Sequence, residues 1–148
     1  MDQPYMLDTN VFNDVRDGKI SLAAFAGYRL LVIAVQVAEL RATANPDRRA
    51  ALLDVFEEIN PTLVPASSFV LDIEGAGLDQ ACWNDGSGNF DKMLYRLRQL
   101  DGRNRNLNQL CDVVIAETAI KNSATLVSRD ANLRQVVSEF GGRAIDLS

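Results

Sequence analysis

The chain contains no histidine among its 148 residues. This absence excludes a Ser-His-Asp triad, a Cys-His pair, zinc sites built from histidine, and ribonuclease chemistry that uses histidine as acid and base. If the chain is an enzyme, its proton transfers must therefore use carboxylates, lysine, tyrosine or water bound to a metal.

Cysteine and long apolar runs are also scarce. The two cysteines, Cys82 and Cys111, follow no metal-binding or redox spacing, so we expect buried thiols in a reducing compartment. The longest uncharged apolar stretch, residues 30–38, is too short to span a bilayer, and no secretory signal opens the sequence. We therefore expect a cytoplasmic protein.

An excess of positive charge is missing as well. The formal net charge of −5 argues against tight, non-specific binding of nucleic acid through bulk charge. Any contact with RNA or DNA would need a local basic patch, with cations neutralising the acidic centre.

Short apolar runs alternate with helical patterns along the chain. Apolar runs predict strands at 5–8, 29–34, 61–65, 125–128 and 143–147. Helical spacing predicts a helix that begins near residue 9, a second that follows the strand at 29–34 and ends near residue 44, and a third that restarts after a break at 45–47 and ends near residue 60. Further helices are predicted at 68–83, 90–100, 107–121 and 131–140, with a loop at 84–89 and a polar turn at 101–106. This alternation predicts an α/β sandwich around a mostly parallel sheet, in a single domain spanning 1–148.

Four carboxylates occupy informative positions in this pattern: Asp8, Glu39, Asp112 and Asp130. Asp8 and Asp130 follow predicted strands, where active sites of open parallel sheets form, and the other two lie on predicted helices. Oxygen clusters of this kind suit hard divalent cations such as Mg²⁺ or Mn²⁺. Together the four acids favour a metal-dependent phosphodiesterase.

The two acids that follow strands also have a purely structural explanation, whereas the two on helices are harder to explain in that way. Asp8 and Asp130 each precede a predicted helix and could serve as N-caps. Glu39 and Asp112 lie on largely apolar sides of their helices, where an unpaired carboxylate costs several kcal/mol and so usually has a partner or a metal. Glu117, by contrast, has Lys121 four residues later and is expected to form an exposed ion pair.

Four segments carry a family resemblance. Leu7-Asp8-Thr9-Asn10-Val11 resembles the opening of PIN-domain nucleases, and Val37-Ala38-Glu39-Leu40 resembles their helix with the second acid. The segments 111–119 and 125–130 are similar to their third and fourth acidic motifs. No single motif is specific, but the four occur in the family's order across nearly the whole chain.

The resemblance implies a three-layer α/β/α fold and Mg²⁺- or Mn²⁺-dependent hydrolysis of RNA. It implies that Asp8, Glu39, Asp112 and Asp130 bind the metal, and that Thr9, Asn10, Ser128 and Arg129 orient these carboxylates or touch phosphate. A compact member of this size most resembles the VapC-type toxin of a toxin–antitoxin pair, which implies an antitoxin partner and a homodimer. Residues 60–106 match no motif, so the choice of RNA cannot be transferred.

Other interpretations compete with this one. Arg129, Arg103 and Arg105 could guide a phosphate backbone or could simply be solvated charges. A signalling receiver domain would need adjacent acids after the first strand, and Asp8 has no acidic neighbour. A non-catalytic PIN-like module that binds RNA or protein would be expected to lose at least one acid. An RNA-processing nuclease without an antitoxin remains open on the sequence.

Overall fold

The computed structural model of the chain describes residues 3–67, 89–102 and 107–148. Its strands form one sheet in the order β3-β2-β1-β4-β5, and every pair is parallel. The strands are β1 (Tyr5–Leu7), β2 (Leu30–Val32), β3 (Thr62–Leu63), β4 (Thr125–Val127) and β5 (Arg143–Ile145). The expected helix at 68–83, most of the loop at 84–89 and Arg103 and Arg105 lie outside the described residues.

Helices separate the strands, as the sequence pattern predicts. They are α1 (Thr9–Arg16), α2 (Ala34–Arg41), α3 (Pro46–Ile59), α4 (Phe90–Asp101), α5 (Leu107–Lys121) and α6 (Ala131–Glu139), with a short 3-10 helix, η1 (Leu22–Phe25), that the sequence did not predict. None of the described helices is both long and apolar enough to cross a bilayer.

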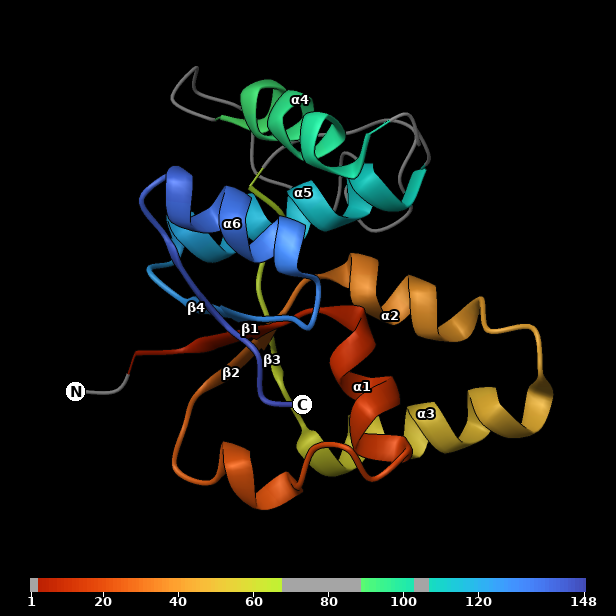
Figure 1. Cartoon of the computed structure of the whole chain (residues 1–148). Coiled ribbons are helices and arrows are strands. Elements are labelled where there is room, and N and C mark those ends of the chain that lie inside the picture. The colour runs from red at the N-terminus through yellow and green to blue at the C-terminus, as the bar shows by residue number, and fades with distance from the viewer. Residues whose placement is uncertain (1–2, 68–88, 103–106) are drawn as a thin grey trace.

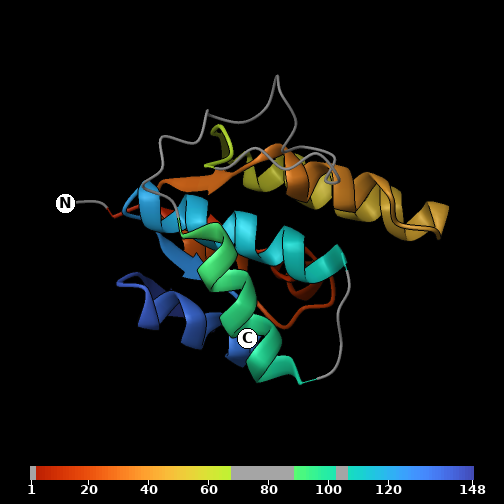
Figure 2. The same ribbon diagram turned by 90° about the horizontal axis from the view of Figure 1, so that it is seen from above.

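Two apolar cores lie on the two faces of the sheet. Met6, Leu31 and Leu126 face α4, α5 and α6, whereas the next residue of each strand, Leu7, Val32 and Val127, faces α1, η1 and α3. Successive side chains of a strand point to opposite faces, so strands buried on both sides read as continuous apolar runs. Figure 1 shows the helices above and below the sheet, and Figure 2 shows α4 lying across α5. The three-layer α/β/α prediction is confirmed.

The sheet order places a switch point at its centre. From β1 the chain adds β2 and then β3 on one side, whereas β4 and β5 lie on the other. Ligands of open parallel sheets bind outside the carboxyl ends of the strands at such a point. The residues that follow β1 and β4 are therefore placed to meet a ligand.

Candidate active site

Asp8 directly follows β1 and is held from three sides. Its Oδ1 accepts a hydrogen bond from the Thr9 backbone N–H at 2.8 Å. Its Oδ2 accepts from Ser128 Oγ at 2.7 Å and from Asn10 Nδ2 at 3.2 Å. The side chain is buried, and it is also the N-cap of α1, as the structural explanation predicted. Its orientation is thus fixed from β4 as well as from its own turn.

Burial dominates the electrostatics of Asp8. It raises the pKa of this carboxyl, and the charge of Asp130 adds to the rise, while the hydrogen bonds from Ser128 and Thr9 and the charge of Arg129 oppose it. These interactions show that Asp8 shares one region with Asp130 and Arg129, which follow β4. The two strand ends therefore meet as expected.

Glu39 reaches the same region from α2. Its Oε1 accepts a hydrogen bond from Thr9 Oγ1 at 2.8 Å, so Thr9 links two acids: its backbone to Asp8 and its side chain to Glu39. Burial raises the pKa of Glu39, and the negative charge of Asp8 adds to the rise. The second acid thus lies beside the first.

Gln36 fixes the start of α2 relative to β1, a role that the sequence did not reveal. It is fully buried, its Nε2 donates to the Leu7 carbonyl at 2.9 Å, and its Oε1 accepts from the Ile33 backbone N–H at 3.0 Å. Its amide satisfies backbone groups at the end of β1 and the start of α2, which sets the distance between Asp8 and Glu39.

Asp130 combines two roles that the sequence presented as alternatives. Its Oδ1 caps α6 by accepting from the Asn132 and Leu133 backbone N–H groups at 3.0 and 3.2 Å. Its own backbone N–H donates to Ser128 Oγ at 3.1 Å, and that hydroxyl donates onward to Asp8. Ser128 therefore couples the two strand-end acids, and the Oδ2 of Asp130 takes no part in the cap.

Asp112 projects from α5 into the same group of acids. None of the described residues donates a hydrogen bond to it. Burial raises its pKa to about 9, with further contributions from the charges of Asp8, Glu39, Asp130 and Asp101. Because an electrostatic effect of this kind requires proximity, the structure brings all four predicted acids together. Cys111, beside Asp112, is a thiol at neutral pH, since burial and the charges of Glu39 and Asp112 raise its pKa to about 12.

The chemistry of these side chains suits a hard divalent cation. The four acids offer carboxylate oxygens, and a bound cation would reduce the repulsion between their charges. Arg129 is the positively charged side chain that acts on Asp8. The amide oxygen of Asn10 adds a buried acceptor with no partner among the described residues. Within the same residues, however, no three side chains of Asp, Glu or Cys already lie close enough to hold one ion.

Asp14 is a residue that the sequence did not single out. It lies on α1, its side chain is 1% exposed, and its Oδ1 pairs with Arg129 Nη1 at 2.6 Å. Its Oδ2 is buried with no partner among the described residues. Arg129, predicted as a phosphate contact, is thus tethered to α1, while its side chain stays 46% exposed. The tether keeps the guanidinium beside the acids.

The expectation for Glu117 is wrong. Glu117 is 2% exposed rather than on the surface. Its Oε1 accepts from Ser67 Oγ and its Oε2 from the Asn89 backbone N–H, both at 2.7 Å. It is buried because α5 is enclosed on all sides, from Val113 to Ala119. Glu117 therefore joins α5 to the residues before α4 and is not among the charges that act on Asp112.

Of the comparisons with known proteins, the one with solved structures found matches. No protein-family model and no curated protein matches the sequence. Among solved structures, VapBC2 from Rickettsia felis, crystallised with a DNA fragment from its promoter, is 18% identical, with a TM-score of 0.51 over 97% of this chain and 98% of that one.

Two further structures are similar to the same extent. A domain of a protein of unknown function from Methanocaldococcus jannaschii has a TM-score of 0.53 at 14% identity, covering 99% of this chain and 91% of that one. PAE2754 from Pyrobaculum aerophilum has a TM-score of 0.53 at 13% identity, covering 99% and 92%. The likeness spans the whole chain, and at these identities it shows a shared fold.

Proposed function

We propose that this chain, which has a VapC-like PIN-domain fold, is a metal-dependent endoribonuclease and the toxin of a toxin–antitoxin pair. The observation that supports this most is the gathering of Asp8, Glu39, Asp112 and Asp130 at the switch point of the sheet. A stability role alone would not explain why burial and the charges of Asp8, Glu39 and Asp130 raise the pKa of the fourth acid, Asp112, to about 9.

The four carboxylates would hold Mg²⁺ or Mn²⁺. When bound, the cation would supply a nucleophilic water at neutral pH and neutralise charge on the phosphate oxygens. Histidine, which the chain lacks, is then not needed for catalysis.

The chain's own residues prepare this site. Ser128, Thr9 and Asn10 orient Asp8, and Thr9 also orients Glu39. Asp112 carries a proton at neutral pH in the metal-free protein, so binding of a cation would release that proton.

Arg129 is the cation best placed to contact the scissile phosphate. Asp14 occupies one of its nitrogens at 2.6 Å, the Arg129 side chain is 46% exposed, and its charge acts on Asp8, so further guanidinium donors remain for a phosphate. Asp14 would then act as a positioning residue that holds Arg129 in place before the substrate arrives.

A toxin of this kind requires an antitoxin. The similarity to VapBC2, a complex of this type, supports such a partner, and the family resemblance also implies a homodimer. A small DNA-binding protein encoded beside this chain should bind it and suppress cleavage. Sedimentation of the purified chain would test self-association.

Cleavage of a mixed RNA pool by the purified protein tests the proposal. We expect cleavage with Mn²⁺ or Mg²⁺, none with EDTA, and none by a folded Asp112→Asn variant. The matched control is Asp54→Asn, which removes an exposed carboxylate of α3 and should cleave like the parent.

The other outcomes have defined meanings. Cleavage that persists in Asp112→Asn would identify a contaminant and refute the site. RNA binding without cleavage by any variant would favour the non-catalytic PIN-like module. Cleavage without any effect of a neighbouring gene product would favour an RNA-processing nuclease.

A further inference from the structure

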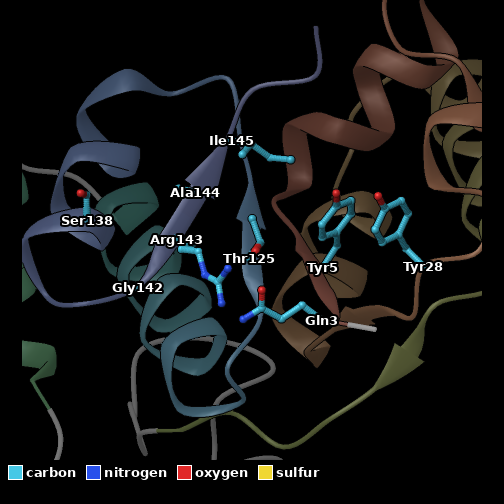
Figure 3. Close-up of a pocket in the computed structure, with 9 residues that line it drawn as sticks. All are labelled: Gln3, Tyr5, Tyr28, Thr125, Ser138, Gly142, Arg143, Ala144 and Ile145. Atoms are coloured by element: carbon cyan, nitrogen blue, oxygen red, sulfur yellow. The ribbon is translucent and has the colours of Figure 1, made fainter. Parts of the chain in front are cut away.

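A cavity of about 560 Å³ lies at the end of the sheet opposite the four acids. It opens where β1, β4 and β5 begin, as Figure 3 shows. Its described lining combines an arginine, two tyrosines and small polar groups, and contains no carboxylate: Gln3, Tyr5, Tyr28, Thr125, Ser138, Gly142, Arg143, Ala144 and Ile145. In a chain with a net charge of −5, this is an unusual local composition.

Strand register places the key side chains in one row. Thr125 pairs with Tyr5 on one side and with Arg143 on the other. All three point to the face of the sheet that carries Val127 and Leu7, because side chains two residues apart on a strand share a face. On that face α1 and α3 pack on the later strand residues. Of the first residues, Arg143 is exposed, Tyr5 is half-buried and Thr125, between them, is buried.

The aromatic end of the row is a stacked pair. The rings of Tyr5 and Tyr28 are parallel within 13°, with their centroids 4.3 Å apart (Figure 3). A hydrogen bond between the two side chains raises the pKa of Tyr5, so Tyr5 stays neutral. Tyr28 is 46% exposed, and it therefore offers an aromatic surface that is already fixed in orientation.

The cationic end of the row is Arg143. Arg48, Arg96, Arg129 and Arg134 each form an ion pair with a carboxylate. Arg143 is exposed and pairs with none of the carboxylates in residues 3–67, 89–102 and 107–148. Its full charge is available to a ligand in the cavity.

We infer that this row binds single-stranded RNA, with a base stacked on Tyr28 and a backbone phosphate on Arg143. Base-aromatic stacking tolerates any base, and a guanidinium matches phosphate geometry. Neighbouring strands lie about 5 Å apart, so Tyr5 and Arg143 are about 10 Å apart across the row.

The inference rests on the proposed function, because it assigns part of the substrate to this face. Asp8 follows Tyr5 by three residues, so the row and the acids are about 10 Å apart along the strand direction. One RNA chain of several nucleotides can therefore reach both. Contacts at this face would retain RNA without touching the reacting atoms.

The test measures binding of a short, fluorescein-labelled, single-stranded RNA of mixed sequence to the full chain in EDTA, where no cleavage is expected. Tyr28→Leu and Arg143→Gln should each weaken binding about fivefold, equivalent to about 1 kcal/mol. Tyr28→Phe and Arg143→Lys, which keep the ring and the charge, should bind more tightly than these variants. Exposed residues elsewhere supply the matched controls, Tyr95→Leu and Arg16→Gln, which should bind like the parent.

A second measurement separates a phosphate contact from a change in folding. Loss of one phosphate contact to a single strand should lower the slope of log affinity against log salt by about 0.7. Arg143→Gln should show this change, and Tyr28→Leu should keep the parent slope. Thermal unfolding of each variant verifies that it is folded, and Tyr28→Ser replaces Tyr28→Leu if the latter is unstable.

Each outcome decides between the two proposals. Parent-like RNA affinity in both Tyr28→Leu and Arg143→Gln, with metal-dependent cleavage by the parent, overturns this inference and leaves the nuclease standing. Weakened binding in both variants, with no cleavage by the parent under any metal, supports the inference and refutes the nuclease. Absence of RNA binding by the parent overturns the inference. The inference is also overturned if free adenosine monophosphate binds the parent as tightly as the RNA strand does and both variants lose the same affinity for it. The row would then be a mononucleotide site.

Discussion

Replacing Asp112 with asparagine should stabilise the metal-free protein while it abolishes activity. The buried carboxyl has no hydrogen-bond donor among the described residues and lies near the charges of Asp8, Glu39 and Asp130. Asparagine has nearly the same shape and carries no charge. Near neutral pH the carboxyl must take up a proton on folding, and asparagine removes that free-energy cost without creating a cavity.

The magnitude follows from the pKa of Asp112, which rises from 3.8 to about 9. Between these values the folded protein binds more protons than the unfolded chain, so the free energy of unfolding falls as the pH rises. At about pH 7 the shift corresponds to at most about 4 kcal/mol, at about 1.4 kcal/mol per unit. Because Asp8 and Glu39 share in the repulsion, we expect a gain of at least about 1 kcal/mol, or about 3 °C in Tm.

Thermal unfolding in EDTA across the acidic to neutral range measures this effect. Asp112→Asn should be more stable than the parent near neutral pH, and the difference should shrink as the pH falls towards the ordinary pKa of aspartate. Mn²⁺ should raise the Tm of the parent more than that of the variant, because only the parent keeps all four ligands. A variant that is less stable than the parent near neutral pH, or a difference independent of pH, would refute the reasoning.

Three further outcomes are expected. Glu117→Gln should lower the free energy of unfolding in urea by about 1–3 kcal/mol, because the amide can accept through one oxygen and leaves one buried donor unpaired. Asp14→Asn should raise KM for RNA more than it lowers kcat, because Arg129 loses the carboxylate that holds it at 2.6 Å. In a protein that already carries Arg129→Gln, adding Asp14→Asn should change KM no further. Arg48→Gln should lower the Tm only slightly, and high salt should reduce the difference, since the pair of Arg48 with Asp17 is exposed.

Sequence patterns could predict the strands and the acids that follow them. The strands are buried on both faces, and such strands appear as short continuous apolar runs that stand out from helical spacing. Position in the chain then places Asp8 and Asp130 at the same edge of the sheet. Asp112 could be found because its neighbours on the helix are small and apolar.

Buried polar residues whose partners are distant in sequence could not be predicted in the same way. Gln36 binds the Leu7 carbonyl, 29 residues away, and Asp14 binds Arg129, 115 residues away. A helix position shows which residues share a side, and long-range packing decides whether that side is covered. Glu117 did leave a signal, because a helix that is apolar all round is buried on every side. The exposed ion pair predicted for it relied only on the spacing to Lys121.

The four acids differ in how firmly the fold holds them, and this difference bears on how a cation would bind. Asp8 accepts three hydrogen bonds, Asp130 accepts two as a helix cap, and Glu39 accepts one from Thr9. Asp112 accepts none from the described residues and has the pKa of about 9. A carboxyl without donors can rotate at little cost, whereas rotation of Asp8 would break three bonds. No three acids in the described part of the chain lie close enough to share an ion. In the metal site that we propose, we therefore expect Asp112 to be the ligand that rotates and loses a proton when a cation binds.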